Sequence, residues 1–189
     1  YALNEVSFWS GGLNAGIINE KGDKSFNREQ GPEAMSDEFG GYQPVGDLMF
    51  DFGAPVSESS FLREIRLDEG CVSARGERKG VHIQSKAFCS YPDQVMVLHY
   101  TSDKPSGLSG NLLFATQRPT DSVFVEGNTL RLVCPLPNGM RCEVLASVRH
   151  HGGVLKEADK HLSLEEADSC TILLAIETNY EMDFSKNFR

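Results

Sequence analysis

Histidines are the residues of this 189-residue chain whose chemistry would be easiest to recognise in the sequence. His150 and His151 are adjacent, and because neighbouring side chains of a strand point to opposite faces, one metal ion cannot easily bind both. His82 and His99 fall within expected strands, where a hydrogen-bonded or solvent-facing imidazole is the usual case. The histidines therefore give no reason to expect a metal site.

Carboxylates are plentiful, but glycoside hydrolysis needs two of them facing each other across a cleft. Glu165, Glu166 and Asp168 are close in sequence, yet a solvated turn explains them more simply. The chain also lacks the Gly-x-Ser-x-Gly, His-Glu-x-x-His, phosphate-loop and Gly-rich dinucleotide motifs. We therefore predict no catalytic residue, no metal and no cofactor in this chain.

The five cysteines are scattered without a Cys-x-x-Cys pair, and four of them lie in or beside apolar runs. Buried free thiols are the simplest interpretation, because an odd count argues against a complete disulfide framework. One bridge between neighbouring strands stays possible in an oxidising compartment. The cysteines are Cys71, Cys89, Cys134, Cys142 and Cys170.

Composition limits the class of protein and its partners. The chain carries 27 acidic and 18 basic residues, for a net charge of −9, and its basic residues form no cluster. Nucleic acid and anionic membranes are therefore not expected partners. The apolar fraction of 40% is sufficient for a core, and the length fits a single domain spanning residues 1–189.

The clearest structural signal is the stretch YQPVGDLMFDF at residues 42–52. Pro44 and Gly46 predict an entry turn, after which Leu48, Phe50 and Phe52 alternate with residues 47, 49 and 51. This period of two is typical of a strand with one buried face. The stretch therefore predicts a turn followed by a strand.

Similar alternation predicts roughly ten strands at the turn spacing of β-sandwiches, and no segment has sustained helical periodicity. We therefore predict an all-β fold, an antiparallel two-sheet sandwich. Residues 14–41 are expected to form a long surface loop with one helical turn near residues 32–35. The other expected strands lie within residues 61–74, 81–90, 94–101, 108–116, 123–125, 130–134, 140–148, 154–155, 161–164 and 169–178. The predicted core contains Leu48, Phe50, Val95, Val97, Val144, Ala146, Ile172 and Leu174.

Four residues are candidates for a surface that meets a partner domain or faces substrate: Asn4, Glu5, Trp9 and Tyr42. Trp9 and Tyr42 each adjoin a turn containing glycine or proline, which places large amphipathic side chains at the end of a sheet. The simpler alternative is that both aromatic side chains pack locally within the sandwich and that Asn4 and Glu5 are ordinary turn residues.

Six segments, in this order, resemble the N-terminal domain of glycoside hydrolase family 95, the inverting α-L-fucosidases. They are LNEVSFWSGG (residues 3–12), YQPVGDLMFDF (42–52), LREIRLDEG (62–70), FCSYPDQVMVLHYTSDKPSGLSGNLLF (88–114), GMRCEVLASV (139–148) and ADSCTILLAIETNY (167–180). No single segment is diagnostic, but their common order covers most of the chain.

This resemblance implies a supersandwich of the glycoside hydrolase N-terminal type, packed against a helical (α/α)₆ catalytic domain of the same polypeptide. It also implies that the catalytic carboxylates and asparagines lie in that barrel, so this chain alone should not hydrolyse glycosides. Compared with the family, the first strand is missing and the insertion before residue 42 is reduced, which predicts a fragment. Family members imply a secreted or periplasmic location, although no signal peptide is visible.

Two other classes of function stay open from the residues alone. A free-standing carbohydrate-binding module would need an exposed aromatic platform, for which Trp9, Tyr42, Tyr91 and Tyr180 are candidates. A structural or adhesion module would need neither platform nor barrel, and fold alone cannot decide between these functions.

Overall fold

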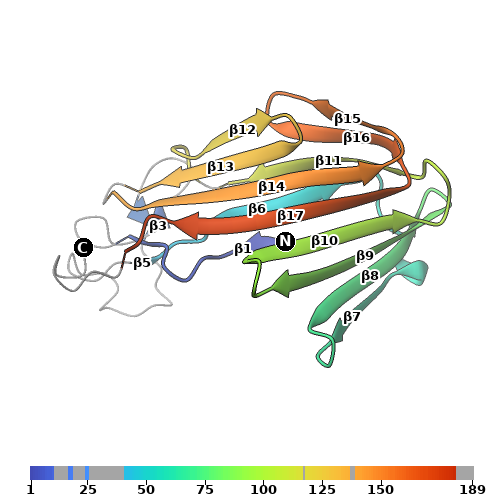
Figure 1. Cartoon of the computed structure of the whole chain (residues 1–189), viewed down its shortest axis with the longest axis horizontal. Coiled ribbons are helices and arrows are strands. Elements are labelled where there is room, and N and C mark those ends of the chain that lie inside the picture. Colours follow the sequence, from blue (N-terminus) through green and yellow to red (C-terminus); the bar gives the residue numbers. More distant parts are fainter. Residues whose placement is uncertain (11–16, 19–23, 26–40, 117, 137–138, 182–189) are drawn as a thin grey trace.

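The protein is two antiparallel β-sheets packed face to face, as seen in a computed structural model that describes residues 1–10, 17–18, 24–25, 41–116, 118–136 and 139–181 (Figure 1). The larger sheet has eight strands in the order β12–β13–β14–β17–β10–β9–β8–β7, and the smaller has five in the order β1–β6–β11–β16–β15. No α-helix occurs among the described residues, nor any helix long and apolar enough to cross a membrane. The predicted all-β sandwich is confirmed.

The strands of the larger sheet are β7 (Leu62–Arg66), β8 (Cys71–Arg78), β9 (Val81–Ser90), β10 (Val95–Ser102), β12 (Ser122–Glu126), β13 (Thr129–Pro135), β14 (Arg141–His151) and β17 (Ser169–Thr178). Those of the smaller sheet are β1 (Ala2–Leu3), β6 (Gly46–Asp51), β11 (Leu108–Ala115), β15 (Val154–Glu157) and β16 (His161–Ala167). Two short pairs add β2 (Trp9–Ser10) with β5 (Gly41–Tyr42), and β3 (Ile17–Ile18) with β4 (Lys24–Ser25). The 3₁₀ turn η4 (Glu58–Ser60) precedes β7.

The core lies between the two sheets and follows the predicted alternation. In β14 every second residue, from Cys142 to Val148, is buried, as the period of two requires when one face packs on a second sheet. Five of the predicted core residues are buried: Leu48, Val144, Ala146, Ile172 and Leu174.

Three predicted core residues are only half-buried. Leu98 and Tyr100 take the inner face of β10, so Val95 and Val97 point to the outer face of the eight-stranded sheet. Phe50 packs at the margin of the core, with its ring 5.0 Å from that of Tyr100. The assignment of Val95 and Val97 to the core was therefore wrong, whereas Phe50 packs against the core as predicted.

The segment predicted to be one long loop contains the short strand pair β3–β4. The helical turn expected near residues 32–35 lies outside the described residues.

All five cysteines are free, and only Cys89 is exposed. Burial raises the pKa of the Cys134, Cys142 and Cys170 thiols to about 12, so these three stay protonated at neutral pH. The prediction of buried free thiols is confirmed for all but Cys89.

Candidate functional site

The predicted aromatic pair lies at one end of the sandwich, where β2 and β5 pair; β5 is at the left in Figure 1. Trp9 and Tyr42 are direct cross-strand partners, and their rings meet edge to face with centroids 5.6 Å apart. The indole Nε1 of Trp9 donates a hydrogen bond of 2.8 Å to the carbonyl oxygen of Val6. The Trp9 side chain nevertheless stays 47% exposed, so it is not packed inside the sandwich.

Glu5 orders the turn that leads into Trp9. Its Oε2 accepts hydrogen bonds from the backbone nitrogen and the hydroxyl of Ser7, at 2.8 and 2.5 Å. The Ser7 hydroxyl also shares a hydrogen bond with Oγ1 of Thr178, the last residue of β17. Burial raises the pKa of Tyr42, and the charge of Glu5 adds to this effect. The structure thus brings Glu5, Trp9 and Tyr42 together, while Asn4 is an exposed neighbour in the chain.

A buried ion pair supports this end of the sandwich, and sequence reasoning missed it. Nε of Arg118 donates to Oδ1 of Asp121 at 3.0 Å, and both side chains are almost fully buried. The other guanidinium nitrogens donate to the carbonyl oxygens of Pro44 and Val45, and the group lies 5.2 Å from the centre of the Phe8 ring. The pair therefore links the turn before β6 to the segment carrying Trp9.

Burial raises the pKa of the Asp121 carboxyl, although the charge of Arg118 opposes this effect. The spacing Arg-x-x-Asp was the only signal in the sequence, and it does not indicate burial, because Arg and Asp side chains are mostly exposed.

The opposite end of the eight-stranded sheet carries a polar groove of about 640 Å³. Because β10 and β17 are antiparallel, with Met96 opposite Leu174, the end of β10 lies far from Thr178 and from the aromatic pair. All but two of the described residues that line the groove have polar side chains, the exceptions being Gly76 and Ile83.

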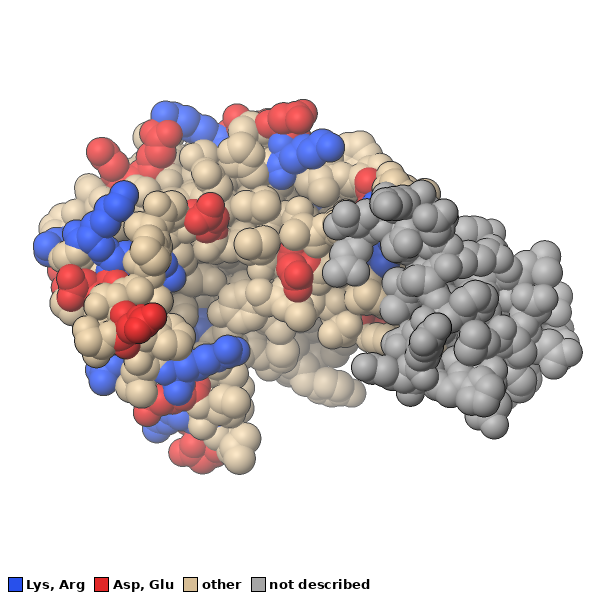
Figure 2. Space-filling view, turned by 180° about the vertical axis from the view of Figure 1, so that it is seen from behind, with Lys and Arg blue, Asp and Glu red and all other residues tan. Residues whose placement is uncertain are grey.

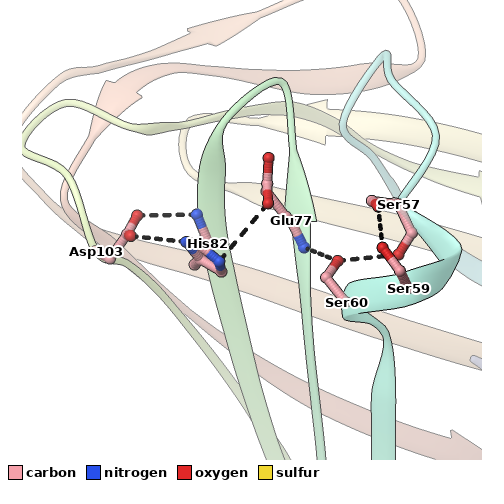
Figure 3. Close-up of polar contacts among 6 residues, drawn as sticks. All are labelled: Ser57, Ser59, Ser60, Glu77, His82 and Asp103. Atoms are coloured by element: carbon pink, nitrogen blue, oxygen red, sulfur yellow. Dashed lines mark hydrogen bonds and ion pairs between the residues drawn. The ribbon is translucent and has the colours of Figure 1, made fainter.

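An imidazole held between two carboxylates forms one wall of the groove (Figure 3). Nδ1 of His82 lies 2.9 Å from Oδ2 of Asp103, and the His82 backbone nitrogen donates to Oδ1 at 2.8 Å. On its other side, Nε2 of His82 is 3.8 Å from Oε2 of Glu77. The His82 ring is therefore oriented by both neighbours while its side chain stays 62% exposed.

Serines before β7 form the facing wall. The backbone nitrogen of Glu77 donates to Oγ of Ser60 at 2.8 Å, and that hydroxyl donates to the carbonyl oxygen of Ser57 at 2.9 Å (Figure 3). The hydroxyls of Ser57 and Ser59 lie 3.1 Å apart. The turn η4 is thus fixed to the edge of β8 beside the His82 wall.

The floor of the groove is a row of side chains from three neighbouring strands. Arg75 is opposite Gln84 in the β8–β9 ladder, and Gln84 is opposite Thr101 in the β9–β10 ladder. This register cannot be read from the sequence, because the three residues lie in separate strands with no shared motif. The groove is therefore a site that sequence reasoning missed.

We expect Asp103→Asn to destabilise the fold in a pH-dependent way. The backbone N–H of His82 and then its side chain hold the pKa of Asp103 below its usual value. Because the folded-state pKa is lowered, the stabilisation is present above the unfolded-state pKa of about 3.9 and is lost as pH falls through the folded-state value. Urea unfolding should show wild type more stable than the variant at neutral pH and a vanishing difference near pH 2. If the difference in stability did not depend on pH, the lowered pKa of Asp103 in the folded protein would be contradicted.

Charges on the described surface are mixed in sign. Figure 2 shows Lys and Arg interspersed with Asp and Glu on the face seen from behind, with apolar and polar residues between them. Ion pairs such as Lys156 with Glu165 and Arg66 with Glu69 are exposed and join residues close in sequence. This face carries no basic stripe of the kind that nucleic-acid backbones require.

Comparison with known proteins places these features in context. Residues 15–183 match the protein family described as "Glycosyl hydrolase family 65, N-terminal domain". "Alpha-L-fucosidase 2" of Arabidopsis thaliana is 24% identical over 172 residues, which are 76% of this chain and 20% of that protein. "Probable alpha-fucosidase A" of Aspergillus niger is 29% identical over 99 residues, which are 50% of this chain and 12% of that protein.

Among solved structures, "Putative kojibiose phosphorylase from human microbiome" superposes with a TM-score of 0.43 at 11% identity, over 71% of this chain and 21% of that one. The chain spans a fifth or less of the length of the curated relatives it matches.

Proposed function

Because the chain belongs to the family of glycosyl hydrolase family 65 N-terminal domains, we propose that it is a non-catalytic β-sandwich that supports a helical catalytic domain of the same polypeptide. The resemblance predicted from the sequence is confirmed at the level of an N-terminal glycoside hydrolase domain, whereas membership of family 95 stays a prediction. Both curated relatives are named as fucosidases, so we take α-L-fucosyl or related glycans as the substrate class of the whole protein.

The observation that carries the interface in this proposal is the half-exposed aromatic pair on a rigid support. Trp9 and Tyr42 present an amphipathic surface, next to Val6, which is 82% exposed. Behind them, the Arg118–Asp121 pair and the Glu5–Ser7–Thr178 contacts fix the backbone. Large aromatic side chains held in a fixed position are typical anchors of an interface between domains.

The proposal is tested by comparing the isolated chain with the longer polypeptide encoded by the same gene. We expect the longer polypeptide to hydrolyse 4-nitrophenyl α-L-fucopyranoside and the isolated chain to show no turnover. Trp9→Ala should destabilise the sandwich by about 2 kcal/mol more in the longer polypeptide than in the isolated chain, because an interface anchor is lost only there. Calorimetric unfolding of the four proteins gives this difference.

Ile65→Ala is the matched control, because Ile65 is 67% exposed on β7, all of whose residues are exposed. If Ile65→Ala produces the extra loss in the longer polypeptide and Trp9→Ala does not, the interface lies at β7 and the assignment of Trp9 and Tyr42 is wrong. Turnover by the isolated chain that disappears when one of its own carboxylates is replaced would contradict the non-catalytic role.

A further inference from the structure

We propose that the groove formed by Ser60, Arg75, His82, Gln84, Thr101 and Asp103 is a binding site for a short segment of neutral glycan. The groove lies at the opposite end of the eight-stranded sheet from Trp9 and Tyr42, so it is separate from the proposed domain interface. That the groove binds a polar ligand follows from its geometry alone, whereas the choice of a glycan rests on the proposed function.

The floor of the groove offers hydrogen-bonding groups that the protein leaves unused. Within the described part of the chain, the side chains of Arg75, Gln84 and Thr101 form no ion pair or hydrogen bond. Direct cross-strand partners have Cβ atoms about 5 Å apart, so the three side chains form a short ladder across β8, β9 and β10. A ligand lying across the strands can therefore contact all three at once.

The types of these groups match the hydroxyls of a sugar ring. Arg75 only donates hydrogen bonds, the Gln84 amide both donates and accepts, and the Thr101 hydroxyl does either. Asp103 already accepts one hydrogen bond at each oxygen from His82, and each oxygen retains capacity for another. Neighbouring hydroxyls of a sugar can accept from Arg75 or Gln84 and donate to Asp103.

Charge favours a neutral ligand over a polyanion. Among the described lining residues Arg75 alone is permanently cationic, whereas Asp103 lines the groove and Glu77 contacts the His82 wall. The chain as a whole has a net charge of −9. Among the described residues no Phe, Tyr or Trp side chain lines the groove, so the affinity should be weak, with a Kd on the order of 1 mM.

The fixed wall makes the site pre-organised. His82 is oriented by Asp103 and Glu77, and η4 is tied to β8 through Ser60 and Glu77. A ligand entering the groove therefore does not have to order these groups, which lowers the entropic cost of binding.

The test is a titration of the isotopically labelled 189-residue chain, followed by amide chemical shifts. The probes are methyl α-L-fucopyranoside, maltotetraose and cellotetraose, each up to about ten times the expected Kd. We expect at least one probe to give saturable shifts centred on the amides of Gln84 and Thr101. Arg75→Ala and Gln84→Ala should each weaken that binding about tenfold, as expected for losing a hydrogen bond to a charged or well-placed polar group.

Arg149→Ala is the matched control, because Arg149 is an exposed arginine on β14 outside the groove; it should leave the affinity unchanged. The proposal is overturned if no probe shifts these amides, or if binding persists unchanged in both groove variants. It is also overturned if only sodium sulfate binds there, through Arg75. Because the readout is binding to the isolated chain, a longer polypeptide without fucosidase activity would contradict the proposed function and leave this result intact.

Discussion

Replacing Asp121 with alanine should lower the free energy of unfolding by about 3–5 kcal/mol, because it leaves the Arg118 charge buried without its partner. Both side chains are almost fully inaccessible to solvent, so water cannot take the place of the lost carboxylate. Urea unfolding at neutral pH measures the loss. A cost below about 1 kcal/mol, typical of exposed pairs, would show that Arg118 reaches solvent.

Asp121→Asn is the matched control, because asparagine keeps an oxygen acceptor for Nε of Arg118 and removes only the charge. Since burial raises the pKa of Asp121, the stability linked to its protonated form is fully present below the unfolded-state pKa of about 3.9 and is lost as pH rises through the folded-state value. Asparagine does not titrate. The stability deficit of the Asn variant relative to wild type should therefore narrow as pH rises.

Alternation in the sequence was sufficient to predict strands whose two faces differ. In β14 the apolar residues from Cys142 to Val148 occupy every second position, so the buried face is set by local pattern alone. In β10 both faces carry apolar residues, so the alternation does not show which face is buried. Pairing with β9 and β17 places Leu98 and Tyr100 inward, which is why Val95 and Val97 were wrongly assigned to the core.

The candidate sites could be predicted from the sequence to different degrees, because some depend on a local signal and others on contacts between distant segments. Trp9 and Tyr42 each adjoin a turn, so the sequence placed both at a sheet end, and the structure adds their direct pairing. Arg75, Gln84 and Thr101 become neighbours only through the register of two ladders. Burial of Arg118 depends on contacts with Pro44 and Val45, more than 70 residues earlier in the chain. Such long-range contacts leave no periodic signal in the sequence.

Leu48→Ala should lower the free energy of unfolding by about 2–5 kcal/mol, whereas Met49→Ala should change it by less than about 1 kcal/mol. The two residues are adjacent in β6, but Leu48 is 1% exposed in the core opposite Phe114, and Met49 is 45% exposed on the other face. Truncating Leu48 removes apolar burial and leaves a cavity between the sheets. Truncating Met49 leaves space that water can fill, so no cavity forms. Urea unfolding of both variants, with the m-value unchanged, measures the two losses. Equal costs for the two variants would mean that β6 does not present one face to the core, and the register of β6 with β11 would then be wrong.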